Sequence, residues 1–218
     1  MKTILGRELR NYWGNRYEAM QGVAVFVVVC ALFPLGVKPS NETLVVMAPA
    51  VLWAAALLAC VFGLETLFRQ ELRDGWLEQV ATSVWPLPLL LGLKLLVHWC
   101  FTGLPVCLAS LFVGYSLGLS SEATGVAALS LALGTPALVG LGSVAAALTA
   151  NLTGGAMLSA LLVLPLYVPV MVFGASAIEL AQNGGESTAP LYLLGCFLLL
   201  TMCLAPLASA AALHAVAE

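Results

Sequence analysis

The sequence contains little charge. Only 9% of its 218 residues are charged, whereas 61% are hydrophobic, and an average soluble domain carries about 25% charged residues. This composition excludes an ordinary soluble domain, and the net charge of −3 gives no indication of a nucleic-acid partner. Several apolar runs reach the roughly 20 residues that a helix needs to cross a bilayer. The sequence therefore predicts an all-α membrane protein.

Ionisable groups are scarce where an ion-driven carrier would need them. Residues 123–178 contain no Asp, Glu, Lys, Arg or His, although carriers driven by ion gradients usually keep such groups at membrane depth. Within the predicted spans the candidates are Lys94, which can extend to the interface, and His98 one helical turn later. The GxxxxGK[ST] loop that binds nucleotide phosphates is also missing. We therefore expect any work on a substrate to be powered by another chain.

Signs of catalysis are missing as well. The sequence shows no acid pair, nucleophile–base pair or metal-ligand cluster, so we expect a non-catalytic chain with no metal and no cofactor of its own. His98, beside Trp99, has two interpretations: a haem ligand or a hydrogen-bond donor between helices. The lack of a second ligand favours the donor.

Six spans are predicted, at about 19–37, 44–64, 91–113, 123–148, 156–178 and 190–213. Their connections are short, so residues 1–218 form a single transmembrane domain with both termini on one side. Basic residues set the orientation, because they are enriched in cytoplasmic loops. Lys38 lies on one side and seven others on the opposite side, namely Lys2, Arg7, Arg10, Arg16, Arg69, Arg73 and Lys94. We therefore expect cytoplasmic termini and, on the acidic outer side, Glu42, Glu122, Glu179 and Glu186.

Two segments outside the spans are amphipathic. Residues 65–78 hold six charged side chains, yet Phe68, Leu72 and Trp76 recur at i, i+4 and i+8, which predicts a helix with one apolar face. On the cytoplasmic side this helix could dock a partner or lie on the bilayer. The expected docking residues are Glu65, Phe68, Arg69, Leu72, Arg73, Asp74, Trp76 and Glu78. The basic, aromatic segment before the first span predicts an interfacial elbow helix, or it sets the topology alone.

Proline and glycine recur inside the spans. A proline within a helix frees a backbone carbonyl and can bend the helix. The hinge candidates are Pro105, Gly134, Pro136 and Pro165. Ordinary close packing of membrane helices is the alternative explanation.

The arrangement of six spans, elbow and cytoplasmic helix resembles the membrane subunit of a small exporter of the ABC-2 type. The segments Phe68-Arg-Gln-Glu-Leu72 and Pro86-Leu-Pro88 resemble the cytoplasmic loop of the haem exporter family CcmB. Lys94-x-x-x-His98-Trp99 and Leu133-Gly-Thr-Pro136 continue the resemblance, which covers nearly the whole chain. At Ser83-Val-Trp85 the chain departs from it, since the family tends to have a further proline there.

The resemblance implies a permease subunit of the cytochrome c maturation system in the bacterial inner membrane. Its expected partners are an ABC ATPase subunit that holds ATP, a second copy of the chain, haem-handling C and small D subunits and, indirectly, a periplasmic haem chaperone. The expected function is to couple ATP hydrolysis to haem export or delivery and to release of the loaded chaperone. The alternatives are a membrane scaffold that transports nothing and, less favoured, a secondary transporter.

Overall fold

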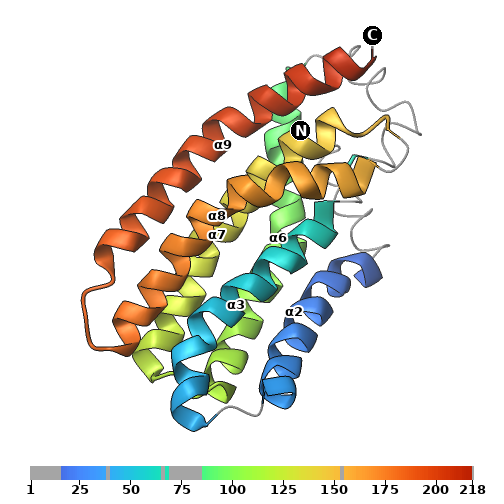
Figure 1. Ribbon diagram of the computed structural model, residues 1–218. Helices are drawn as coiled ribbons and strands as arrows, with labels where there is room; N and C mark the ends of the chain where they lie inside the picture. The colour runs from blue at the N-terminus through green and yellow to red at the C-terminus, as the bar shows by residue number, and fades with distance from the viewer. Residues whose placement is uncertain (1–15, 38–39, 65–66, 69–84, 153–154, 218) are drawn as a thin grey trace.

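Six long α-helices make up nearly all of the structure, a computed structural model (Figure 1) that describes residues 16–37, 40–64, 67–68, 85–152 and 155–217. Every regular element in these ranges is helical. The helices are α2 (Arg16–Val37), α3 (Asn41–Leu64), α6 (Leu87–Ser116), α7 (Ser121–Leu148), α8 (Gly155–Gln182) and α9 (Thr188–Ala217). The expected elbow and most of the expected docking helix lie outside the described residues.

Five of these helices are long and apolar enough to cross a membrane, and the apolar part of α2, Met20–Gly36, is shorter. The expectation of an all-α protein with several membrane-spanning helices is therefore confirmed. Helix α6 begins four residues before its predicted span at 91 and ends three residues after its predicted end at 113.

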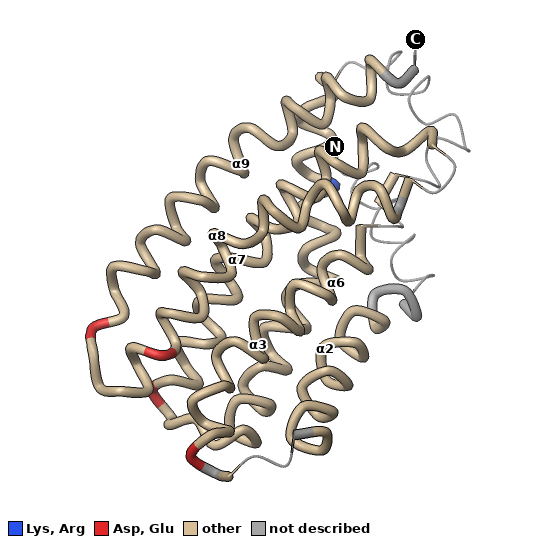
Figure 2. Tube along the Cα trace, in the orientation of Figure 1, with Lys and Arg blue, Asp and Glu red and all other residues tan. Residues whose placement is uncertain are grey.

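The helices alternate in direction, so the α2–α3, α6–α7 and α8–α9 connections meet at one end of the bundle (Figure 1). The acidic residues whose side chains are described, Glu42, Glu122, Glu179 and Glu186, gather at this end, as predicted, whereas the single blue residue lies towards the other end (Figure 2). That residue is Lys94, the only Lys or Arg whose side chain is described. Which end faces the cytoplasm stays a prediction.

Helix α7 is the central helix of the bundle. It is the most deeply buried of the five long apolar helices and packs against α3, α6, α8 and α9. Small residues make this possible, because glycine and alanine allow helix backbones to approach closely in a membrane. Helix α2 packs on the outside of α3 and α6, and α9, mostly exposed, lies at the far side of α7 (Figure 1).

Polar contacts define the tight α6–α7 turn. Gly118 has a φ of 83°, a left-handed conformation that glycine adopts without strain. The Ser120 hydroxyl then accepts a hydrogen bond from the Ala123 N–H at 3.1 Å, which is the usual N-cap arrangement. The Ser120 N–H donates to Gln182 Oε1 at 2.8 Å, and so the turn is attached to the end of α8.

All six helices continue through internal prolines. Helix α8 contains Pro165 and Pro169 and changes direction along its length (Figure 1). The loss of a backbone hydrogen bond at each proline explains how a helix can bend without ending. Whether any of the four hinge candidates moves stays a prediction.

Candidate functional site

The candidate site is built on the first half of α6, where Lys94, His98 and Trp99 lie within two turns. We expected Lys94 to extend to the membrane interface, but its side chain is buried, with 5% exposed. Its Nζ lies over the Phe68 ring, 5.4 Å from the ring centroid. This distance falls within the roughly 6 Å range of a cation–π interaction. The aromatic ring thus gives the ammonium group a favourable contact inside the bundle.

The contact between Lys94 and Phe68 lowers the free-energy cost of burying the lysine. A charged side chain at the centre of a bilayer costs about 2.5–3.5 kcal/mol on insertion scales. Lys94 is seven residues from the start of α6, about 10 Å along the axis, so it lies short of the middle of the helix. A desolvated cation–π contact contributes about 2 kcal/mol. The Phe68 ring can therefore offset much of the cost of burying Lys94.

Phe68 directly follows α3, and the Leu67 N–H donates to the Leu64 carbonyl at 3.2 Å. Both Leu67 and Phe68 are buried. Phe68 was expected to contact a partner protein, but within this chain it packs inside the bundle, against Lys94 of α6. Phe68 belongs to residues 65–78, the charged stretch that we call the polar segment. The other expected docking residues lie outside the described residues, namely Glu65, Arg69, Leu72, Arg73, Asp74, Trp76 and Glu78.

His98 packs against α3 and has 1% of its surface exposed. A Cβ added at Gly63 would lie 3.4 Å from His98 Nε2, so Gly63 is where α3 leaves space for the imidazole. The His98 carbonyl accepts a hydrogen bond from the Thr102 hydroxyl at 2.8 Å. Among the described residues no group of three or more His, Cys, Asp and Glu could hold a metal ion.

Trp99 links α6 to α7. Its Nε1 donates a hydrogen bond to Thr135 Oγ1 at 2.9 Å, and the Thr135 hydroxyl donates to the Leu131 carbonyl at 2.7 Å. A Cβ at Gly103 would overlap the pyrrole edge of the Trp99 indole and lie 3.2 Å from Thr135 Oγ1. Glycine at 103 therefore allows the indole to reach Thr135.

A second tryptophan, Trp53 of α3, packs on a different face of the same α7 segment, at Gly134, and was missed by the sequence analysis. Its side chain is completely buried. A Cβ at Gly134 of α7 or at Gly174 of α8 would overlap the Trp53 ring. Its Nε1 has no hydrogen-bond partner among the described residues. The surrounding stretch of α3 is apolar on every face, so no sequence pattern distinguished this tryptophan.

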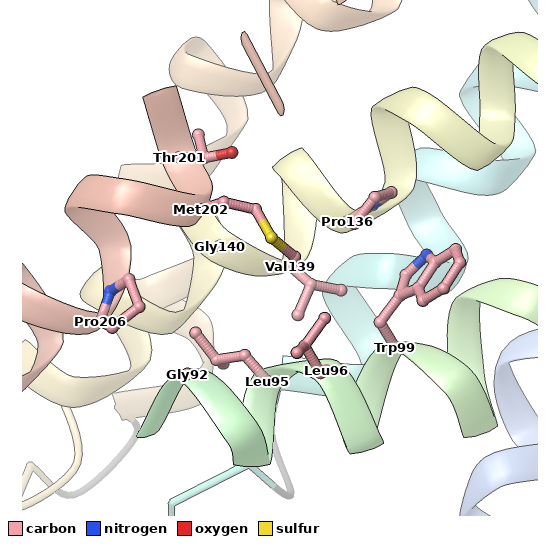
Figure 3. Close-up of a pocket in the computed structure, with 10 residues that line it drawn as sticks. All are labelled: Gly92, Leu95, Leu96, Trp99, Pro136, Val139, Gly140, Thr201, Met202 and Pro206. Atoms are coloured by element: carbon pink, nitrogen blue, oxygen red, sulfur yellow. The ribbon is translucent and has the colours of Figure 1, made fainter. Parts of the chain in front are cut away.

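A pocket of about 140 Å³ lies between α6, α7 and α9 (Figure 3). Its walls are almost entirely apolar. The Trp99 N–H is already bonded to Thr135, and the Thr201 hydroxyl donates to the Phe197 and Leu198 carbonyls of its own helix. The ten lining residues are Gly92, Leu95, Leu96, Trp99, Pro136, Val139, Gly140, Thr201, Met202 and Pro206.

The size and chemistry of this pocket limit what it can hold. Sites for small molecules and cofactors usually measure about 300–1,000 Å³ and include a few polar groups that fix the ligand. The α6–α7–α9 pocket is smaller than that, and both of its polar side chains are already hydrogen-bonded. It can hold a small apolar group and is too small for a porphyrin.

The hinge candidates are distributed unevenly around these features. Gly134 packs against Trp53, and Pro136 lines the pocket. Thr135, between them, accepts the hydrogen bond from Trp99. Three consecutive residues of α7 thus make contacts in three different directions. Pro105 lies further along α6, and Pro165 is exposed on α8. The structure therefore brings Trp99 and Pro136 to one pocket, whereas Gly134 packs against Trp53.

Fold and site together define a multi-pass α-helical membrane protein whose described spans are poor in ionisable groups. Comparison with known proteins identifies its family, because the family model described as "CcmB protein" matches residues 1–216. The chain belongs to the CcmB family, as the sequence resemblance indicated.

Curated relatives with the name "Heme exporter protein B" agree. The Pseudomonas aeruginosa protein is 42% identical over 210 residues, which cover 96% of this chain and 94% of the relative. The Paracoccus denitrificans protein is 42% identical over 216 residues, 98% of each chain. The Escherichia coli K12 protein is 40% identical over 211 residues, 97% of this chain and 96% of the relative.

Proposed function

We propose that this chain is the membrane permease subunit of an ABC export complex for cytochrome c biogenesis. The observation that carries the proposal is the family match over residues 1–216, with relatives named as heme exporters over nearly their whole length. In this role the chain has no catalytic activity of its own. It couples ATP hydrolysis in a partner subunit to haem export or delivery and to release of the haem-loaded periplasmic chaperone.

The scarcity of ionisable groups supports an external energy source. Residues 123–178 have no group that could bind a coupling proton or sodium ion through a charge, and the described cation of α6, Lys94, is buried against Phe68. A gradient-driven carrier would need such groups at membrane depth. ATP hydrolysis on a partner chain removes this requirement, and the polar segment after Phe68 is the proposed contact.

The proposed assembly contains two copies of this chain with the ATPase, together with haem-handling C and small D subunits in the bacterial inner membrane. Both termini face the cytoplasm in this arrangement. The apolar residues Leu72 and Trp76 contact the ATPase. The register at the edge is set by Arg69, Arg73, Asp74 and Glu78. Apolar anchors of this kind usually dominate an interface, with about 2 kcal/mol or more from the best of them.

One observation favours a second candidate, a membrane scaffold that does not transport haem itself. The α6–α7–α9 pocket of about 140 Å³ is too small for haem. A scaffold needs no haem-sized pocket and would still hold the haem-handling subunits together. The two functions differ in whether this chain changes shape when the ATPase works.

The docking proposal is tested by Trp76→Ala in the full complex. A loss of about 2 kcal/mol corresponds to a roughly 30-fold weaker interaction, so we expect much less ATPase to co-purify and little cytochrome c to assemble. The control is Trp85→Ala, a tryptophan that is 42% exposed just before α6. Normal co-purification and normal cytochrome c with Trp76→Ala would refute the docking role.

A separate experiment distinguishes permease from scaffold. The ATPase partner is inactivated by substitution of its catalytic residue, and the fluorescence of a probe on this chain is followed as ATP is added to reconstituted complex. A permease responds to ATP only with the active partner. An identical signal with active and inactive ATPase supports the scaffold.

A further inference from the structure

We propose that the contact between Phe68 and Lys94 is the joint through which force on the polar segment reaches the membrane helices. Both are positioning residues, since they act through α6 and touch no substrate. The inference rests on the proposed function, because it concerns how ATP-driven movement enters the bundle. It assigns a role to Lys94, which the docking proposal leaves unused.

The position of Phe68 in the chain supports this role. Phe68 is the last described residue before the segment 69–84 and is buried, with 3% exposed. The hydrogen bond from the Leu67 N–H to the Leu64 carbonyl connects it to the final turn of α3. A displacement of the chain after Phe68 therefore acts first on this ring.

The chemistry of Lys94 makes the contact difficult to break. Its side chain on α6 is buried, with 5% exposed, and its ammonium group lies over the Phe68 ring. Separating the ring from the ammonium group gives up a desolvated cation–π contact, so the separation is opposed. Movement of Phe68 therefore carries Lys94, and with it α6.

Helix α6 connects directly to the centre of the bundle. Trp99, five residues after Lys94, donates its indole hydrogen bond to Thr135 of α7. The next residue, Pro136, lines the α6–α7–α9 pocket and removes a backbone hydrogen bond from α7. Phe68, Lys94, Trp99 and Thr135 therefore form a continuous connection from the polar segment to α7.

Spatial continuity alone does not demonstrate coupling, so the test is a double-mutant cycle in the intact complex. The variants are Phe68→Leu, which removes the ring, Lys94→Met, which removes the charge at similar length, and the double variant. Conservative variants Phe68→Tyr and Lys94→Arg keep the ring and the charge. Phe62→Leu is the matched control for ring loss, because Phe62 is on α3 and 46% exposed.

Two quantities are measured for each variant in reconstituted complex: ATP hydrolysed and haem-loaded chaperone released. We expect Phe68→Leu and Lys94→Met to lower the release per ATP by about 30-fold, the equilibrium effect expected of a desolvated cation–π contact. The amount of co-purified ATPase and its turnover stay unchanged. The double variant is no worse than either single one, and Phe68→Tyr, Lys94→Arg and Phe62→Leu keep wild-type coupling.

The alternative outcomes are distinguishable. Unchanged release per ATP in the single variants, or additive losses in the double variant, overturns the joint and leaves the proposed function in place. Equal losses in Lys94→Met and Lys94→Arg also overturn it. The joint requires a positive charge, which arginine keeps, so equal losses would show that only the size and shape of lysine matter. If the Phe68→Leu protein does not accumulate, the comparison of Lys94→Met with Lys94→Arg decides alone. A wild-type complex that releases no chaperone with ATP overturns the proposed function and the joint with it.

Discussion

Replacing Gly174 with alanine tests whether Trp53 is the packing centre of α3, α7 and α8. A Cβ at position 174 would overlap the Cε2 and Cζ2 atoms of Trp53. The ring has no space on its other side, because a Cβ at Gly134 would already overlap Cη2 and lie 3.2 Å from Cζ2 and Cζ3. The added methyl group can therefore be accommodated only if α8 moves away from α3.

The expected magnitude follows from two opposing effects. Overpacking a filled core costs about 1–3 kcal/mol, and a rigid ring held between two glycines favours the upper end. Alanine gains about 1 kcal/mol over glycine in helix propensity. We therefore expect Gly174→Ala to lower the free energy of unfolding by about 2 kcal/mol.

The measurement is a reversible unfolding titration in mixed micelles, followed by tryptophan fluorescence and helicity. Gly125→Ala is the matched control, since Gly125 is also in a spanning helix and a Cβ there meets nothing within 4 Å. We expect that variant to be neutral or slightly more stable. The double variant Gly174→Ala/Trp53→Ala should be no less stable than Trp53→Ala alone. The reasoning fails if Gly174→Ala behaves like Gly125→Ala, or if its cost adds fully to that of Trp53→Ala.

Two further predictions concern single hydrogen bonds. A double-mutant cycle of Trp99→Phe and Thr135→Val, measured by the same unfolding titration, should give a coupling energy of about 0.6 kcal/mol. The upper limit is about 1.7 kcal/mol, as for other hydrogen bonds between membrane helices. A coupling energy of zero would contradict the bond. Tyr167→Phe should cost about 1 kcal/mol, because it removes the 2.7 Å bond from the buried Tyr167 hydroxyl to the Leu138 carbonyl. Tyr192→Phe, at a residue 75% exposed, should stay within about 0.5 kcal/mol of the wild type.

The helices were predictable because a long apolar run is a strong and local signal. All six described helices fall on the predicted spans, and most differences are at helix ends. Helix α6 shows why, since it begins after Pro86 and contains Pro88 in its first turn. Proline is favourable at the start of a helix, but a hydropathy profile does not show where a helix starts for this reason.

Packing partners were much harder to predict. In a membrane helix the faces towards lipid and towards protein are both apolar, so amphipathic periodicity carries little information. For this reason nothing in the sequence distinguished Trp53, which is fully buried, from Phe112, which is 78% exposed. The burial of Lys94 was also unexpected, because its partner Phe68 was assigned to the polar segment and to a different interface.

Glycine, threonine and proline at positions 134–136 of α7 explain how the bundle can respond as a unit. Consecutive residues of a helix point about 100° apart, and these three meet Trp53 of α3, Trp99 of α6 and the pocket beside α9. A movement of α6 must therefore either break the Trp99–Thr135 bond or carry Thr135 with it. In the second case the neighbouring Gly134 shifts against Trp53, whose ring is packed between Gly134 and Gly174. We therefore expect a displacement that enters through α6 to reach α3 and the α9 side within one turn of α7.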